Sequence, residues 1–395
     1  MFPFKKEMAA MLISRLPEEI QVEIILKLSV RSILSCKCVC KLWFNLISSP
    51  KFINNHLHLS IQNKNNHKLM FIDKESVTGK PLVYSIDFAS ISSSPDLSCE
   101  YIGNEAILMD YPFEYKEGME IRILGACNGL FCFYISIDTE ISICIWNPTT
   151  KYKEIRHCDF HINPKHPSRA RFGYDSKTRD YKLVRIAEFQ KSDYCKIEVY
   201  TFGLHSSKTV HTFPYNYPRH VAFGGVFLNG ALHWVSNLWK QDNPSNIVSF
   251  DISNEKLMEV LLPEKSIIHP EVSSPRLFKK VGVLGDCLSL VFVDTKLIRA
   301  EVWVLQEYGV RESWTKLFTT TQTPITRYPF CVPVMSLKNG EVLMYTHDGF
   351  VLCDPMNERV GKVSSFFQKI TFRVRIDTMM VTHPESYVDS LVSLN

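Results

Sequence analysis

Residues 12–52 read LISRLPEEIQVEIILKLSVRSILSCKCVCKLWFNLISSPKF, and they decide the fold of the first part of the chain. Pro17 suits the first position of a helix because its φ is fixed, and the two glutamates after it meet the positive end of the helix dipole. Ile20, Ile24 and Leu28 recur every four residues and form one apolar stripe. The stretch therefore predicts a helix that begins at Pro17.

Two further short helices are predicted in this stretch. Ser29 can cap the second helix. One face of it would carry Ile33, Cys36, Val39 and Cys40. The third would present Trp43, Leu46 and Ile47 and would end at Ser48-Ser49-Pro50. Three helices of this size bury little core, so we expect a partner surface or the following domain to complete them.

Length and composition limit what the rest of the chain can be. Its 395 residues exceed what the helices and one ordinary domain need, unless the second domain is a large β architecture. A net charge of +4 is too small to argue for nucleic acid, and no apolar run approaches a membrane span of roughly 20 residues. The 12 cysteines follow no regular framework, and no signal peptide is evident, which favours a cytoplasmic or also nuclear location without membrane attachment.

Strand-like runs replace the helical pattern beyond Phe52. Residues 69–73 and 82–88 are apolar and β-branched, and a turn at Gly79 separates them. The serine-rich residues 90–98 are expected to form a flexible loop.

A tight-turn dipeptide followed by an alternating strand then recurs along the chain. The four dipeptides are Asn128-Gly129, Asn229-Gly230, Gly285-Asp286 and Asn339-Gly340. The last three begin at positions 229, 285 and 339, which are 56 and 54 residues apart, and the larger first step leaves room for a hidden unit near residues 175–180. A period of about 50 residues with four strands per unit is typical of kelch-like propeller blades.

These patterns predict a mainly β fold with a small N-terminal α module. The helical module would occupy residues 11–55, and a kelch-like β-propeller of about six blades would occupy residues 56–395. A strand near the C-terminus would close the ring against an early strand. An irregular β-sandwich is the alternative architecture.

The first stretch resembles the F-box family. The matching residues are Leu16-Pro17-Glu18, Ile24, Leu26, Leu28, Lys37, Val39, Cys40, Lys41, Trp43, Leu46, Ile47, Pro50 and Phe52. In that family the F-box binds a Skp-type adaptor, which binds a cullin scaffold in a ubiquitin ligase. The resemblance implies that the adaptor-binding face is formed or shaped by Leu16, Pro17, Ile20, Ile24, Val39 and Trp43. This chain departs from many plant relatives at Ser29, where they have proline. The alternative to an F-box is a helical hairpin that only packs on the rest of the chain.

The body resembles the F-box-associated domain of plants, most closely the S-locus F-box group. The matching segments are Cys127-Asn128-Gly129-Leu130, Trp146-Asn147-Pro148-Thr149-Thr150, Phe172-Gly173-Tyr174-Asp175, Asp180-Tyr181-Lys182-Leu183-Val184-Arg185-Ile186, Glu198-Val199-Tyr200, Glu307-Tyr308-Gly309-Val310, Glu312-Ser313-Trp314-Thr315-Lys316-Leu317 and residues 385–394. Members of that group recognise stylar S-type ribonucleases in pollen and direct them to ubiquitination in self-incompatibility. The resemblance implies a non-catalytic substrate receptor with such a ribonuclease as its target. A general plant F-box receptor for another protein is the alternative.

Target choice is expected in loops, because loops on a rigid scaffold carry recognition. Two segments stand out, residues 157–171 and residues 215–220. Tyrosine and arginine dominate binding hot spots. The candidate target-binding residues are His161, Arg169, Tyr215, Tyr217 and Arg219. Ordinary solvated connections are the alternative interpretation of both segments.

Other kinds of chemistry have weak support in the sequence. The C-x-C-x-C run at residues 36–40 lacks the spacing of a zinc site, and the His, Cys and Asp residues at 157–166 lack a second anchoring element. No hydrolase, metalloprotease or phosphate-loop motif occurs, and the sparse cations have no stacking platform for nucleic acid. We therefore expect no catalytic residue, metal, cofactor or direct nucleic-acid contact. A propeller enzyme or scaffold with an incidental helical front is the rival hypothesis.

Overall fold

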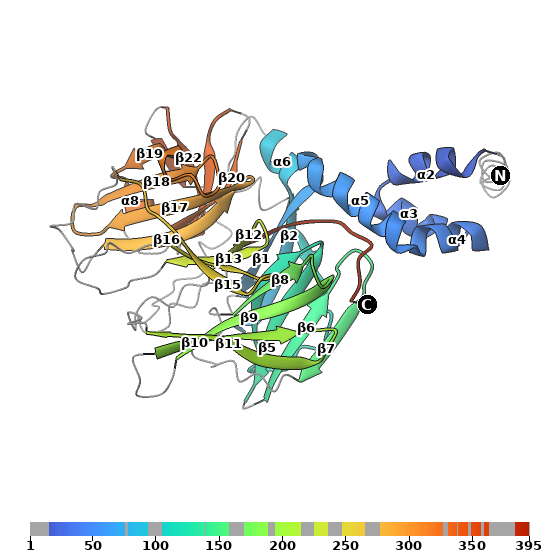
Figure 1. Ribbon diagram of the computed structural model, residues 1–395. Helices are drawn as coiled ribbons and strands as arrows, with labels where there is room; N and C mark the ends of the chain where they lie inside the picture. Colours follow the sequence, from blue (N-terminus) through green and yellow to red (C-terminus); the bar gives the residue numbers. More distant parts are fainter. Residues whose placement is uncertain are drawn as a thin grey trace.

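A helical arm projects from a ring of six four-stranded sheets (Figure 1). This is seen in a computed structural model. It describes residues 16–75, 78–93, 105–138, 140–157, 170–188, 194–214, 225–235, 247–264, 277–326, 331–337, 339–346, 349–356, 359–362 and 384–394. The predicted order of an α module followed by a β-propeller of about six blades is confirmed.

The arm consists of α2 (Glu18–Leu26), α3 (Val30–Cys36), α4 (Lys41–Ser48) and α5 (Pro50–Gln62). The predicted cap is confirmed, since the Ser29 hydroxyl accepts a hydrogen bond from the Ser32 amide at 3.4 Å. The predicted length of the second helix is wrong. It ends at Cys36, so Val39 and Cys40 lie beyond it, and the Cys40 thiol instead accepts from the Trp43 amide at the start of α4.

The predicted end of the third helix at Ser48-Ser49-Pro50 is confirmed, since α4 ends at Ser48, but a further helix that the sequence analysis did not predict begins there. The Ser49 hydroxyl accepts from the Phe52 amide at 3.3 Å, and Pro50 takes the first position of α5. A Ser-Pro pair ends one helix and begins the next because serine caps and proline suits the first helical position. Helix α5 runs through residue 55, and the predicted domain limits of 11–55 and 56–395 stay predictions.

Each blade is an antiparallel sheet whose first named strand lies innermost. Blade 1 joins β24 (Glu385–Val388), β1 (His67–Lys74), β2 (Pro81–Asp87) and β3 (Ile107–Met109). Blade 2 joins β4 (Glu120–Cys127), β5 (Leu130–Ile137), β6 (Glu140–Trp146) and β7 (Lys153–His157). Blade 3 joins β8 (Ala170–Asp175), β9 (Asp180–Glu188), β10 (Tyr194–Thr201) and β11 (Ser206–Pro214).

The second half of the ring repeats the same order. Blade 4 joins β12 (Val226–Leu228), β13 (Ala231–Val235), β14 (Ile247–Asp251) and β15 (Lys256–Val260). Blade 5 joins β16 (Leu277–Leu284), β17 (Cys287–Asp294), β18 (Arg299–Leu305) and β19 (Trp314–Thr320). Blade 6 joins β20 (Cys331–Ser336), β21 (Val342–Thr346), β22 (Gly349–Asp354) and β23 (Arg359–Lys362). Short helices η1 (Lys64–Asn66), α6 (Phe88–Ser93), η3 (Arg311–Ser313) and α8 (Thr323–Thr326) lie between strands.

The predicted repeat is confirmed in detail. The four tight-turn dipeptides lead into the second strands of blades 2, 4, 5 and 6, and blade 3 is the hidden unit. Asn128 and Gly129 have φ of 55° and 80°, and Asn229 and Gly230 have 51° and 75°, as a turn with two left-handed residues requires. The serine-rich loop prediction is wrong for residues 90–93, which belong to α6, and its remaining residues lie outside the described part.

The last strand closes the ring. Strand β24 pairs antiparallel with β1, from Met70 opposite Glu385 to His67 opposite Val388. Blade 1 is therefore built from both ends of the chain, as predicted. The residues after β24 emerge beside the arm.

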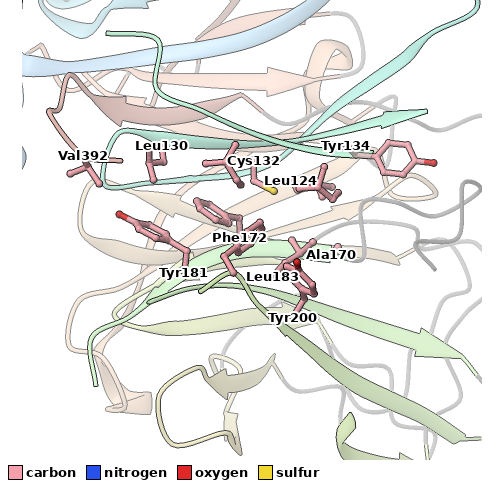
Figure 2. Packing of buried hydrophobic residues seen from close by; sticks show 13 residues of the cluster. Leu124, Leu130, Cys132, Tyr134, Ala170, Phe172, Tyr181, Leu183, Tyr200 and Val392 are labelled. Atoms are coloured by element: carbon pink, nitrogen blue, oxygen red, sulfur yellow. The ribbon is translucent and has the colours of Figure 1, made fainter. Parts of the chain in front are cut away.

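Apolar residues between neighbouring sheets form the core. Figure 2 shows the cluster between blades 2 and 3, where Leu130 and Cys132 of one sheet face Phe172 and Leu183 of the next. All four side chains are fully buried or nearly so. Because each sheet buries both faces, strands such as β5 are almost continuously apolar, and the ring is a rigid base for its loops.

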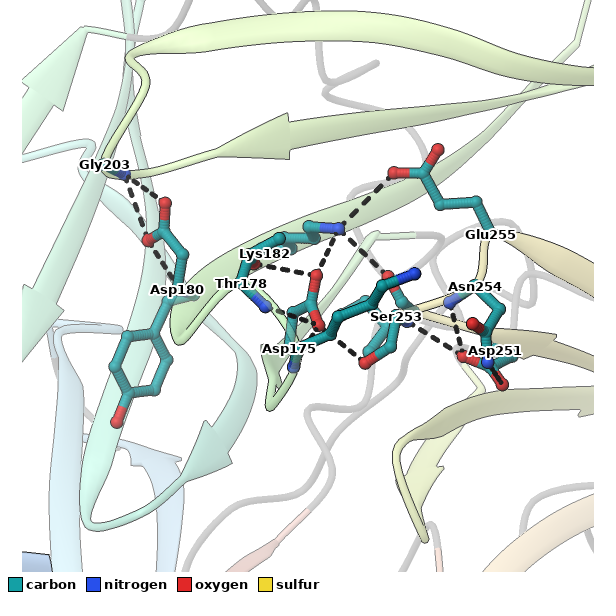
Figure 3. A network of polar contacts seen from close by, with 12 residues as sticks. Asp175, Thr178, Asp180, Lys182, Gly203, Asp251, Ser253, Asn254 and Glu255 are labelled. Carbon is teal, nitrogen blue, oxygen red and sulfur yellow. Dashed lines mark hydrogen bonds and ion pairs between the residues drawn. The ribbon is translucent and has the colours of Figure 1, made fainter.

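A buried polar network joins blades 3 and 4 (Figure 3). The Lys182 ammonium lies 2.7 Å from the Asp175 carboxylate and donates to the Ile252 carbonyl at 3.0 Å. The Ser253 hydroxyl donates to the same carboxylate at 2.6 Å. Burial alone would raise the pKa of Asp175, but its hydrogen bonds, led by that from Lys182, hold this pKa below its ordinary value. These contacts join blade 3 to blade 4.

Candidate functional site

The arm exposes several apolar side chains at and before its first helix. Ile20 is 42% exposed and Ile24 is 36% exposed on α2, and Leu16 before the helix is 38% exposed. Pro17 is also exposed, as is Val39 in the turn between α3 and α4. Apolar side chains that are exposed next to one another are typical of protein interfaces. We name the exposed residues among those predicted to bind the adaptor the adaptor face, and their binding role stays a prediction: Leu16, Pro17, Ile20, Ile24 and Val39.

Trp43 differs from the other predicted adaptor residues because it is buried, with 5% of its surface exposed. Its indole Nε1 donates to Oε1 of Gln21 at 2.8 Å, and Nε2 of Gln21 donates to the Leu16 carbonyl at 2.8 Å. Trp43 is thus linked through Gln21 to the backbone of Leu16, and its own side chain is too buried to contact a partner directly. Gln21 is not singled out by the sequence, because its partner lies 22 positions away.

Helix α4 adds two apolar side chains that the sequence interpretation left out. Leu42 is 54% exposed and Phe44 is 53% exposed, on either side of the buried Trp43. The signal for them is present in the sequence. A helix with apolar residues at 42, 43, 44, 46 and 47 has more apolar positions than one buried stripe can use.

The C-terminal residues complete the core of the arm. Leu391 packs with Ile25, Ile33, Ile47 and Phe52, and all five are buried. We name residues 389–394 the C-terminal strap. The arm is therefore completed by the far end of the chain, in line with the expectation that the following domain would do so.

Hydrogen bonds fix the C-terminal strap to blade 2. Asn147 is fully buried, and its side-chain Nδ2 donates to the Ser390 carbonyl at 3.1 Å and to the Val392 carbonyl at 2.9 Å. The Thr149 hydroxyl donates to the Asp389 carboxylate at 2.8 Å. Val392 also packs in the apolar cluster between blades 2 and 3, together with Ile53 and Leu57 of α5. The strap thus joins the arm and the ring into one body.

The arm and the blade-to-blade connections lie at opposite ends of the ring. In an antiparallel blade, the turn between strands one and two shares an end with the turn between strands three and four, while the connections between blades leave from the other end. The arm enters β1 and the strap leaves β24 at the first of these ends, where Lys64 of η1 lies 3.5 Å from Asp286 in a turn between strands one and two. We call the opposite end the far side.

Both predicted target-binding segments join one blade to the next. Residues 158–169 connect β7 to β8 and residues 215–225 connect β11 to β12, so the flanking strand ends lie on the far side. The candidate residues themselves lie outside the described residues, and their target-binding role stays a prediction. They are His161, Arg169, Tyr215, Tyr217 and Arg219.

The described residues contain no cluster of metal-binding side chains. Cys36 ends α3 and the Cys40 thiol caps α4, so these thiols serve separate helix ends. Within the described ranges no three His, Cys, Asp or Glu side chains gather as metal ligands do, and the 157–166 candidates fall almost wholly outside those ranges. The described helices also include none that is long and apolar enough to cross a membrane.

Comparison with known proteins agrees with this architecture. An F-box domain matches residues 13–55, and an F-box associated beta propeller domain matches residues 80–394. The F-box/kelch-repeat protein At3g23880 of Arabidopsis thaliana is 27% identical over 311 residues, covering 77% of this chain and 79% of that protein. The F-box protein CPR1 of Arabidopsis thaliana is 27% identical over 329 residues, covering 77% of this chain and 72% of that protein.

Among solved structures, TolB from Acinetobacter baumannii aligns with a TM-score of 0.42 and 9% identity, covering 75% of this chain and 63% of that one. The family assignment rests on the two domain matches, which together span most of the sequence. The chain belongs to the F-box proteins that carry an F-box associated beta propeller domain.

Proposed function

We propose that this chain is the substrate-recognition subunit of a Skp-cullin-F-box (SCF) E3 ubiquitin ligase. The adaptor face binds a Skp-type adaptor and, through it, a cullin, while the far side of the propeller holds a protein substrate. The observation that carries this proposal is an exposed apolar face on an arm that the strap fixes to the ring.

The contribution of this chain is proximity. Ubiquitin passes from a separate conjugating enzyme, so no residue here carries covalent chemistry in the proposal. A tethered acceptor lysine meets the charged enzyme at a raised effective concentration, and the gain is larger when the connection is stiff and matches the required span. The strap supplies that stiffness, because it contacts α5 and blade 2 at once.

For the target, we propose an S-type ribonuclease in pollen, recognised for degradation in self-incompatibility. The support is the resemblance of the body to the S-locus F-box group. Two of its segments have structural roles: the Tyr308 hydroxyl hydrogen-bonds Nε2 of His233, and residues 389–394 form the strap. A general plant receptor for another protein is the second candidate, favoured by the Arabidopsis relatives. We propose that the protein acts in the cytoplasm, with the nucleus as the alternative or additional location.

Adaptor docking is tested by co-expressing the full chain with a Skp-type adaptor. The wild-type chain should co-purify with the adaptor, and Ile20→Arg should lose it because a guanidinium cannot enter an apolar interface unpaired. Leu204→Arg is the matched control, since Leu204 is 73% exposed in a turn of the ring. Equal recovery of adaptor with both variants would remove the adaptor face from the proposal.

Target choice is tested separately by capture from pollen extract. Exchange of residues 158–169, or of residues 215–220, for the corresponding segment of a relative should change which proteins are captured while adaptor binding persists. A captured fraction that lacks S-type ribonucleases but is enriched in another protein would support the general plant receptor instead. Unchanged capture after both exchanges would exclude these segments from recognition.

A further inference from the structure

A cavity of about 740 Å³ lies at the centre of the ring. All six innermost strands line it, through Gly125, Arg171, Val226, Gly282, Val332 and Glu385 among others. Residues of η1 and α6 line it at the end nearer the arm. Its volume falls within the range of about 300–1,000 Å³ that is typical of small-ligand sites. We name it the central channel.

Arg171 offers unused hydrogen-bond donors to the central channel. Its side chain is 5% exposed, and its Nε donates to the Gly225 carbonyl. Nη1 lies 3.7 Å from Oε1 of Glu385, which is beyond hydrogen-bond distance. Within the described residues neither terminal nitrogen of Arg171 has a hydrogen-bond partner. The outer edge of a buried guanidinium therefore faces a cavity with its donors unsatisfied.

The charges around Arg171 favour an anion. Lys280 is 3% exposed, and its pKa lies well below the ordinary value because of burial and of the nearby Arg171 charge. Burial raises the pKa of Glu385, and Arg171 opposes that rise. The Arg171 guanidinium thus shares this end of the channel with one carboxyl group that ionises reluctantly, in surroundings where charges are poorly screened.

The remaining walls suit an apolar body. Val226, Phe227, Val332 and Pro333 line the channel from blades 4 and 6. Ligand sites commonly combine apolar walls with a few polar groups that fix orientation. Arginine is the side chain best suited to a planar carboxylate, because its fork can donate two parallel hydrogen bonds.

We propose that the central channel binds an organic carboxylate, with the carboxylate on Nη1 and Nη2 of Arg171 and an apolar body against the channel walls. Arg171 is the second residue of β8, so this anion site lies towards the far side of the ring. The carboxylate can belong to a small acid or to the C-terminus of a peptide, and the test separates the two sources. The site goes beyond the proposed ligase function and requires neither the adaptor nor the target.

The test uses the full chain and ligand-observed NMR. The probes are 4-phenylbutyrate with its neutral amide, and an acetylated Ala-Ala-Leu peptide with its amide. A carboxylate probe should bind and its amide should not. Binding of 4-phenylbutyrate identifies a small acid as the source, and binding of the peptide alone identifies a C-terminus. The proposal is overturned when neither carboxylate binds, or when the amides bind as well as the acids.

Three variants connect the binding to Arg171. Arg171→Gln should lower the affinity for the carboxylate by at least about tenfold, which corresponds to the loss of one charge-assisted hydrogen bond. Glu385→Gln should tighten it, because the competing carboxyl group is removed. Arg122→Gln is the matched control, since Arg122 is equally buried but pairs with Glu120 and does not line the channel.

Folding of the variants is checked by thermal melting. If Arg171→Gln does not fold, Glu385→Gln still decides, because unchanged or weaker binding in that variant contradicts the proposal. Equal affinity of wild type and a folded Arg171→Gln would also overturn it.

Discussion

Asn147→Ala should loosen the arm from the ring while leaving the adaptor face intact. Asn147 is fully buried, and its amide nitrogen donates to two carbonyls of the strap at 3.1 and 2.9 Å. Its side-chain oxygen accepts from the Thr149 amide at 2.9 Å, so the same residue also holds its own turn. Buried backbone groups that lose a partner cost about 1–3 kcal/mol each, and we expect a loss of about 3 kcal/mol in the free energy of unfolding.

The assay combines urea unfolding with hydrogen exchange. Amide protons of the C-terminal strap and of α5 should exchange faster in Asn147→Ala than in wild type, whereas those of β5 in the same blade should not. Adaptor binding should persist, because the adaptor face contains no strap residue.

Two further variants separate the strap from the turn. Asn147→Asp keeps an acceptor for the turn but loses the donor to the strap, so it should speed strap exchange as well. Asn254→Ala is the control, because Asn254 is an exposed turn residue whose amide bonds only within its own turn in the described structure. A loss of stability below about 1 kcal/mol in Asn147→Ala, or strap exchange equal to that of wild type, would refute the reasoning.

Gly129→Ala should destabilise more than Gly230→Ala in urea unfolding. Both glycines have positive φ, of 80° and 75°. An added Cβ at Gly129 would lie 2.3 Å from a serine hydroxyl of the strap, whereas a Cβ at Gly230 would meet open space. Equal losses of stability in the two variants would contradict the close approach at Gly129. A second prediction concerns His233: the free energy of unfolding should fall by about 3 kcal/mol as the pH drops from about 6.5 to 4. Burial lowers the pKa of His233 from 6.5 to about 4, so the unfolded state takes up the proton first, and His233→Gln should flatten the pH dependence of urea midpoints; an unchanged slope would exclude His233. Asp175→Ala should cost about 3–5 kcal/mol by calorimetry, because it removes the nearest carboxylate from the buried Lys182 ammonium; a neutral outcome would show that water or Glu255 replaces it.

Local sequence signals predicted the repeated blades well. A turn dipeptide with two left-handed residues allows few other backbone paths, so Asn128-Gly129 and Asn229-Gly230 located second strands correctly. Ser29 likewise located the start of α3, because a cap acts within three residues of itself. Pro17, predicted as the first helical residue, lies one position before α2. Such features depend on neighbours in the chain, which the sequence displays directly.

Local signals failed where one motif serves two elements or where the partner is distant. Ser49-Pro50 both ends α4 and begins α5, and the sequence interpretation used only the first role. Trp43 is equally compatible with an interface and a core, and its burial depends on Gln21 across the arm. Asn147 bonds to a carbonyl 245 residues away, which no local pattern can indicate. The strap and the central channel are therefore products of the closed ring.

The most direct measurement is the affinity of the purified full chain for a Skp-type adaptor by calorimetry. Wild type should bind, and a variant with both Ile20→Asp and Ile24→Asp should bind at least about a hundredfold more weakly, because each isoleucine contributes about 1.5–3 kcal/mol when buried. The far side and the strap should keep their hydrogen-exchange protection in that variant. No heat of binding with the wild-type chain, or equal affinity of a folded double variant, would contradict the account of this chain as an adaptor-docked receptor.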